Sequence, residues 1–208
     1  MDGYALPLYE EVMLLALHDT KGTLARPAGD VAVAAAAISE LEWSGRIELE
    51  GPKAFVDLVD ASPTSDLVLD AVLDRLSAGK RRARLSTWLM RIAGIKDLRH
   101  IVARQLVADG VLVVHEKSFL SFDLSVYPEL NPLPEQLVVE RIRQAVVSEG
   151  MKVDGRTARL IGLADATWLL RKVLPGKEKR QHKARIKEMR SGDAVSLAAG
   201  HAVAAMSA

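Results

Sequence analysis

The sequence predicts a mainly α protein: a single globular helical domain of residues 1–208 with two inserted short β-hairpins. Three observations predict this fold class. Apolar residues recur at helical spacing through most of the chain. Two stretches, 46–59 and 111–124, instead hold short strand-like runs around a turn. The hydrophobic content of 49% and the charged content of 26% are typical of a chain that buries a core.

The elements follow from local signals in chain order. In the helix at 30–44 we expect Asp30 to be the N-cap and Gly45 to end the helix. The second hairpin is expected to turn near Lys117. The other expected helices span residues 7–18, 65–78, 83–93 and 96–109, with more helices after the proline-rich connector 128–134. The expected strands span 46–50 and 53–59, then 111–116 and 118–124.

Composition and missing motifs exclude several classes of function. Cysteine is absent, so there is no disulfide frame or thiolate metal site, and a cytoplasmic location is expected. The first residues carry no basic leader, and the apolar runs are shorter than the ~20 residues that span a bilayer. No phosphate-binding glycine loop, paired metal-binding histidines or nucleophile elbow is present. We therefore expect a protein that is not an enzyme and needs no cofactor.

Charge is distributed unevenly along the chain. Residues 1–75 hold 14 Asp and Glu against five Lys and Arg, whereas residues 76–208 hold 13 against 23. This division favours a basic face that meets a polyanion, although folding can also bring the two halves together and neutralise them. Two basic clusters stand out, at 80–84 and 171–190. The helical pattern of 177–190 is more typical of a solvated helix than of one lying on a membrane.

The second hairpin raises the question of function. The chain has three phenylalanines, and two of them, Phe119 and Phe122, lie in 115-HEKSFLSFDLSVYP-128. They either fill the core or contact something outside the protein. A helix followed by a hairpin occurs twice, at 38–59 and 103–124, and is also how a winged helix is built. A nucleic-acid-binding helix at 96–110 with a wing is therefore an alternative.

Several motifs together resemble the Golgi phosphoprotein 3 family, which includes a yeast vacuolar protein sorting relative. They are 8-LYEEVMLLALHDTKG-22, 40-ELEWSGRIELE-50, 110-GVLVVHEKSFLSFD-123, 140-ERIRQAVVSEG-150 and 155-GRTARLIGLADATWLL-170, in the family's order. The resemblance implies a peripheral membrane protein. Family members bind phosphatidylinositol 4-phosphate in a basic pocket and insert an apolar hairpin tip into the bilayer. The Ala, Val and Arg bias favours a bacterial member that acts at the inner face of its membrane on anionic phospholipid.

The resemblance also implies site residues. Phe119, Leu120 and Phe122 fall on the membrane-inserting hairpin. Lys96 and Arg99 fall on headgroup ligands, and Arg84 and Arg91 extend that basic cluster. A further family arginine falls on Ala34, and the family's pocket tryptophan has no equivalent. Possible partners are the cytosolic tails of membrane proteins, which eukaryotic members hold. A third interpretation is an adaptor whose hairpin binds a partner or a second copy of the chain.

Overall fold

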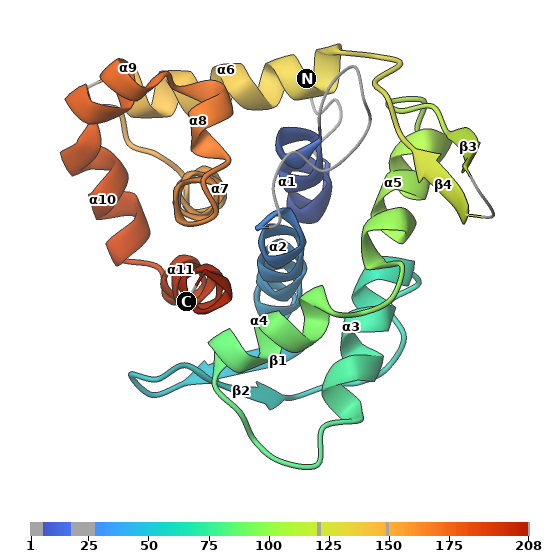
Figure 1. Cartoon of the computed structure of the whole chain (residues 1–208). Coiled ribbons are helices and arrows are strands. Elements are labelled where there is room, and N and C mark those ends of the chain that lie inside the picture. Colours follow the sequence, from blue (N-terminus) through green and yellow to red (C-terminus); the bar gives the residue numbers. More distant parts are fainter. Residues whose placement is uncertain (1–5, 18–27, 120–121, 149, 208) are drawn as a thin grey trace.

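The computed structural model describes residues 6–17, 28–119, 122–148 and 150–207, with the backbone alone described for 117–119 and 122–124. Helices make up most of this part, with two separate antiparallel hairpins, which confirms the predicted mainly α fold (Figure 1). The helices are α1 (Leu8–Ala16), α2 (Gly29–Trp43), α3 (Leu67–Ser77), α4 (Leu85–Ala93), α5 (Leu98–Ala108), α6 (Leu133–Val147), α7 (Gly155–Ala166), α8 (Leu170–Val173), α9 (Gly176–Gln181), α10 (Lys183–Ser191) and α11 (Ala194–Met206). The strands are β1 (Ile47–Glu50), β2 (Phe55–Leu58), β3 (His115–Phe119) and β4 (Phe122–Val126).

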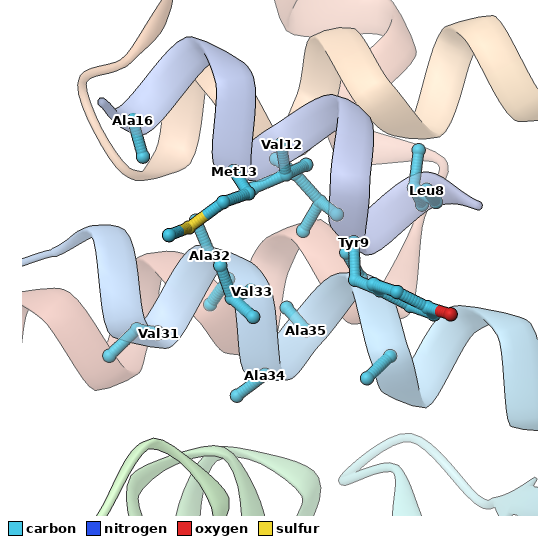
Figure 2. Packing of buried hydrophobic residues seen from close by; sticks show 14 of the residues in the cluster. Leu8, Tyr9, Val12, Met13, Ala16, Val31, Ala32, Val33, Ala34 and Ala35 are labelled. Carbon is cyan, nitrogen blue, oxygen red and sulfur yellow. The ribbon is translucent and has the colours of Figure 1, made fainter. Parts of the chain in front are cut away.

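Helix α2 lies at the centre and contacts α1, α3, α4, α7 and α11. Its alanine-rich sequence allows this position, because small side chains on every face let neighbouring helices approach closely. Figure 2 shows Tyr9 and Met13 of α1 against the 31–35 stretch of α2, where Ala34 is fully buried. The buried hydrophobic residues form one cluster that extends from α1 to α11.

The end of α2 is as predicted, but its start is not. Gly45 has φ +69°, a left-handed conformation that glycine adopts without steric cost. The prediction that Asp30 is the N-cap was wrong, because the helix begins at Gly29 and its N-cap is Ala28. Asp30 instead lies in the first turn, where its carboxylate is half-buried.

The second hairpin also differs from its prediction. Residue Lys117 lies within β3, opposite Leu124 of β4, so the prediction of a turn near Lys117 was wrong. Residues 111–114 are not a strand; Leu112 forms an isolated bridge with Glu129 beside the hairpin base. The strands β3 and β4 pair only with each other among the described strands. The predicted helix at 177–190 is likewise divided, into α9 and α10 at His182.

Part of the charge division is neutralised inside the fold. Arginines from the basic second half of the chain pair with acids from the first half. The pairs include Arg141 with Glu11, at 2.6 Å between Nη2 and Oε2, and Arg156 with Glu40, at 2.8 Å between Nη2 and Oε1. Any anion-binding surface must therefore be found among basic residues that lack such partners.

Candidate functional site

Lys96 and Arg99 lie together in one pocket of about 270 Å³. The pocket is formed where the first turns of α2 meet the connection between α4 and α5. Both side chains are exposed, so their charges are accessible to a ligand. The other lining residues are Asp30, Val33, Ala93, Ile95, Asp97, Leu98 and His100.

The start of α5 adds backbone donors to this pocket. Asp97, the N-cap of α5, has a left-handed φ of 65°, and its side chain caps no backbone N–H. In the described part of the chain, the N–H groups of Arg99 and His100 have no hydrogen-bond acceptor. The first N–H groups of a helix lack intrahelical acceptors and bind anions well. Two cations therefore line the same pocket as two residues whose N–H groups have no acceptor among the described residues.

Two acids reduce the net positive charge of the pocket. Asp30 and Asp97 both line the pocket. Burial raises the pKa of the Asp30 carboxyl, and the charges of Arg99 and His100 oppose that rise. Burial lowers the pKa of the His100 imidazole, with Arg99 acting in the same direction. The pocket thus contains both charge signs, and its net charge depends on the protonation of Asp30 and His100.

The pocket is joined to the base of the second hairpin. His100 Nδ1 lies 3.0 Å from the hydroxyl oxygen of Tyr127, the residue that follows β4. Tyr127 is buried, and its ring is tilted against the imidazole with centroids 5.6 Å apart. In the same region Val113 N donates to Pro128 O at 3.0 Å. These contacts fix the hairpin base to α5, and Figure 1 shows the hairpin at the edge of the molecule outside α5.

Two of the three predicted membrane-inserting residues lie at the ends of the hairpin strands. Leu120 lies outside the described residues. Phe119 is the last residue of β3 and Phe122 is the first residue of β4. The side chains of both lie outside the described part of the structure. The prediction for these three side chains therefore stays a prediction.

The structure does not bring Arg84 and Arg91 to the pocket of Lys96. Arg91 lines a second pocket of about 350 Å³ between α3 and α4, with its guanidinium 4.8 Å above the Trp88 ring. Arg84 is exposed and lines neither pocket. Arg82, from the same basic cluster, is held by Asp57 and Glu50 of the first hairpin.

Sequence reasoning missed three features of these pockets. The pocket positions of Asp30, which the sequence predicts as an N-cap, and of His100, which no motif marks, were not predicted. The second pocket also contains Trp88, whose indole N–H is buried without a partner in the described residues, together with Arg75, Lys80 and Arg81. The basic cluster at 80–84, which contains Lys80 and Arg81, is a sequence signal for this second pocket. Ala34 is buried in the core and supplies nothing to either pocket.

The whole described chain agrees with one protein family. The sequence profile described as Golgi phosphoprotein 3 (GPP34) matches residues 8–206. The chain belongs to the Golgi phosphoprotein 3 family. This confirms the resemblance that the motifs indicated, and the match extends from α1 to the end of α11.

One curated relative is the vacuolar protein sorting-associated protein 74 of Eremothecium gossypii. It is 25% identical over 170 residues, which is 71% of this chain and 51% of the relative. The chain therefore spans about half the length of the curated relative that it matches. Among the described residues, no helix is both long and apolar enough to cross a membrane, and no cluster of His, Asp or Glu could hold a metal ion.

Proposed function

We propose that this protein is a peripheral membrane protein. It binds anionic phospholipid headgroups at the pocket of Lys96 and Arg99, while the hairpin tip at 119–122 enters the bilayer. The single observation that carries the proposal is that these two cations line one pocket at the start of α5, where the N–H groups of Arg99 and His100 have no acceptor among the described residues. A lipid phosphate is the ligand that fits such donors.

The connection between the pocket and the hairpin supports a two-part attachment. A headgroup held at α5 places the bilayer surface close to the hairpin, because His100 and Tyr127 join the two elements. Each Lys or Arg near an anionic surface contributes roughly 1 kcal/mol. Burying one phenylalanine contributes roughly 1.5–3 kcal/mol. Neither contribution anchors a protein firmly, and together they favour reversible attachment.

The pocket favours general anionic lipid over strict recognition of phosphatidylinositol 4-phosphate, the ligand of the family. Lys96 provides a point charge without the planar fork of an arginine. Ala34, where the family has a further arginine, is buried in the core. Asp30 adds a carboxylate that repels a multiply charged phosphate. Holding the cytosolic tails of membrane proteins, as eukaryotic members do, is a further role that this attachment would serve.

Vesicle flotation tests the proposal. Wild type, Lys96→Glu, Arg99→Glu and Phe119→Asp would be mixed with neutral vesicles, with vesicles of a generic anionic phospholipid and with vesicles containing phosphatidylinositol 4-phosphate. Arg104→Glu is the matched control, because Arg104 is exposed on α5 but does not line the pocket. We expect wild type and the control to float with anionic vesicles and the other three variants to stay behind.

Two results would count against the proposal. If Arg104→Glu weakens flotation as much as Arg99→Glu, attachment comes from diffuse charge and not from the pocket. If wild type never floats but binds duplex DNA with a steep salt dependence, the winged-helix alternative holds. A dimer in solution that Phe119→Asp disrupts, without any flotation, would instead favour the adaptor interpretation.

A further inference from the structure

A third pocket, of about 650 Å³, lies among α7, α8, α9 and α10. It shares no residue with the two pockets described above. In Figure 1 these helices lie at the left, whereas the second hairpin lies at the right. The pocket is thus at a different edge of the molecule from the proposed membrane-inserting tip.

Six cations line this pocket, and one acid opposes them. The cations are Arg171, Lys179, Arg180, Lys183, Lys187 and Arg190. Asp165 of α7 is the acid, and it is already paired with two of them: its oxygens lie 2.5 Å from Lys179 Nζ and 2.9 Å from Arg190 Nη1. Within the described residues the remaining four cations have no acidic partner. Four uncompensated charges around one concavity repel one another, and a bound anion would relieve that repulsion.

The walls of the pocket are held in place by other arginines. Arg143 of α6 pairs with Glu178 of α9 at 2.8 Å and donates to the carbonyl of Val173 at 2.8 Å. Arg185 of α10 donates from Nε to the carbonyl of Ala145 at 2.7 Å. These contacts fix α9 and α10 against α6, so the pocket exists before any ligand binds. Preorganised donors lose less entropy on binding than mobile side chains.

Size and charge indicate the chemical class of the ligand. A volume of about 650 Å³ is that of a small-molecule site, and the buried side chain of Ile186 gives it an apolar floor. A phosphate monoester carries a charge of about −1.5 to −2 near neutral pH, so two phosphate groups match four cations. The guanidinium groups of Arg171 and Arg180 suit bidentate contacts with phosphate oxygens. A carboxylate ligand would need about twice as many acidic groups for the same charge.

We infer that the pocket among α7, α8, α9 and α10 is a second anion site, which binds a small molecule that carries two or more phosphate groups. The source of the phosphates is either a free organophosphate or a polyphosphorylated lipid headgroup. The inference is independent of the proposed function, because it uses none of the residues of the first pocket.

Isothermal titration calorimetry with inorganic pyrophosphate tests this inference. The variants are Lys183→Glu and Lys187→Glu, both at exposed positions whose replacement leaves the core intact. Lys177→Glu is the matched control, because Lys177 is exposed on α9 in the same basic segment but does not line the pocket. We expect wild type and Lys177→Glu to bind pyrophosphate, and each pocket variant to bind at least about tenfold more weakly.

A vesicle arm separates the two sources of phosphate. Flotation on vesicles containing phosphatidylinositol 4-phosphate would be measured for Lys183→Glu beside wild type. Weakened pyrophosphate binding with unchanged flotation identifies a free organophosphate, and weakening of both identifies a lipid headgroup. The inference is overturned if pyrophosphate does not bind wild type, or if Lys177→Glu weakens its binding as much as Lys183→Glu. Binding of duplex DNA that depends on Lys183 and Lys187, without pyrophosphate binding, would overturn it in favour of a nucleic-acid surface.

Discussion

The imidazole of His100 and the hydroxyl of Tyr127 lie 3.0 Å apart and join the start of α5 to the end of the second hairpin. The two residues are 27 positions apart in the sequence, so the contact is a property of the fold. It connects the two parts of the proposed membrane attachment, the headgroup pocket and the hairpin. Loss of this contact should therefore affect attachment more than it affects folding.

Tyr127→Phe is expected to weaken vesicle flotation several-fold while the protein stays folded. The change removes the hydroxyl and keeps the buried ring, so the loss of unfolding free energy should be about 1 kcal/mol. Flotation on anionic vesicles and urea denaturation measure the two effects in one preparation. Unchanged flotation with the expected loss of stability would show that the contact serves folding alone.

Asp30→Asn is expected to strengthen binding to anionic vesicles. The substitution removes a negative charge beside Arg99. The charges of the nearby Asp97 and Arg104 are the same in both proteins. An increase of about three- to tenfold is expected at pH values where the Asp30 carboxyl of wild type is ionised. Vesicle titration at fixed ionic strength measures it, and equal binding by the two proteins would place the lipid phosphate away from Asp30.

The pH dependence of binding follows from the same groups. The pKa of Asp30 is raised, so this carboxyl becomes neutral earlier than an ordinary aspartate as the pH falls. His100 gains a proton, and with it a positive charge, only below its lowered pKa. Wild-type binding should therefore strengthen as the pH falls below neutral. Asp30→Asn should show a smaller rise, because protonation of Asp30 then no longer contributes to it.

The sequence predicted helices better than it predicted the site. Helical periodicity and the Gly45 stop depend on local interactions, which a sequence displays directly. The prediction of a turn near Lys117 was wrong because polar residues also occur within these strands. Among the described strands β3 pairs with β4 alone, so a polar residue such as Lys117 need not mark a turn. The grouping of basic residues depends on tertiary contacts. Arg91 and Lys96 are five positions apart, yet they line different pockets.

Asp30 illustrates why the pocket could not be derived. An aspartate at the start of a helical pattern satisfies the rule for an N-cap, but the helix begins one residue earlier. The carboxylate is then half-buried beside residues of the α4–α5 connection, which are more than 60 positions away in sequence. No local pattern contains that information.

Glu10→Gln is expected to stabilise the protein above pH 7. Glu10 is 3% exposed, and one of its carboxylate oxygens has no hydrogen-bond partner in the described residues. Burial raises the pKa of this carboxyl from 4.5 to about 7, with the negative charges of Asp109, Asp66 and Glu11 acting in the same direction. A raised pKa means that the folded state binds more protons than the unfolded state between these two values. Stability is therefore greatest below about pH 4.5 with respect to this group and falls as the pH rises to about 7.

The measurement is the difference in unfolding free energy between Glu10→Gln and wild type as a function of pH. The difference should grow between pH 4.5 and 7 and reach up to about 3 kcal/mol. Glu48→Gln is the control for the same substitution at an exposed position, on β1. A flat profile for Glu10→Gln would show that Glu10 is ionised in the folded protein at neutral pH.

Gly162→Ala is expected to destabilise the packing of α7 against α11. A Cβ at this position would lie 2.4 Å from Ser196 Oγ and 3.1 Å from Ser196 Cβ. Ser196 cannot move away freely, because its hydroxyl and its backbone N–H both donate to Asp193, the N-cap of α11. Either the helices separate or the cap is lost, at a cost of roughly 1–3 kcal/mol.

Gly155→Ala is the control within the same helix, since its Cβ would meet open space. Thermal denaturation should therefore show a lower midpoint for Gly162→Ala and an equal or higher one for Gly155→Ala. Adding Ser196→Ala to Gly162→Ala should cost less than the sum of the two single changes, because the closest clash is then removed. Additive costs would show that α7 and α11 adjust by moving apart as a whole.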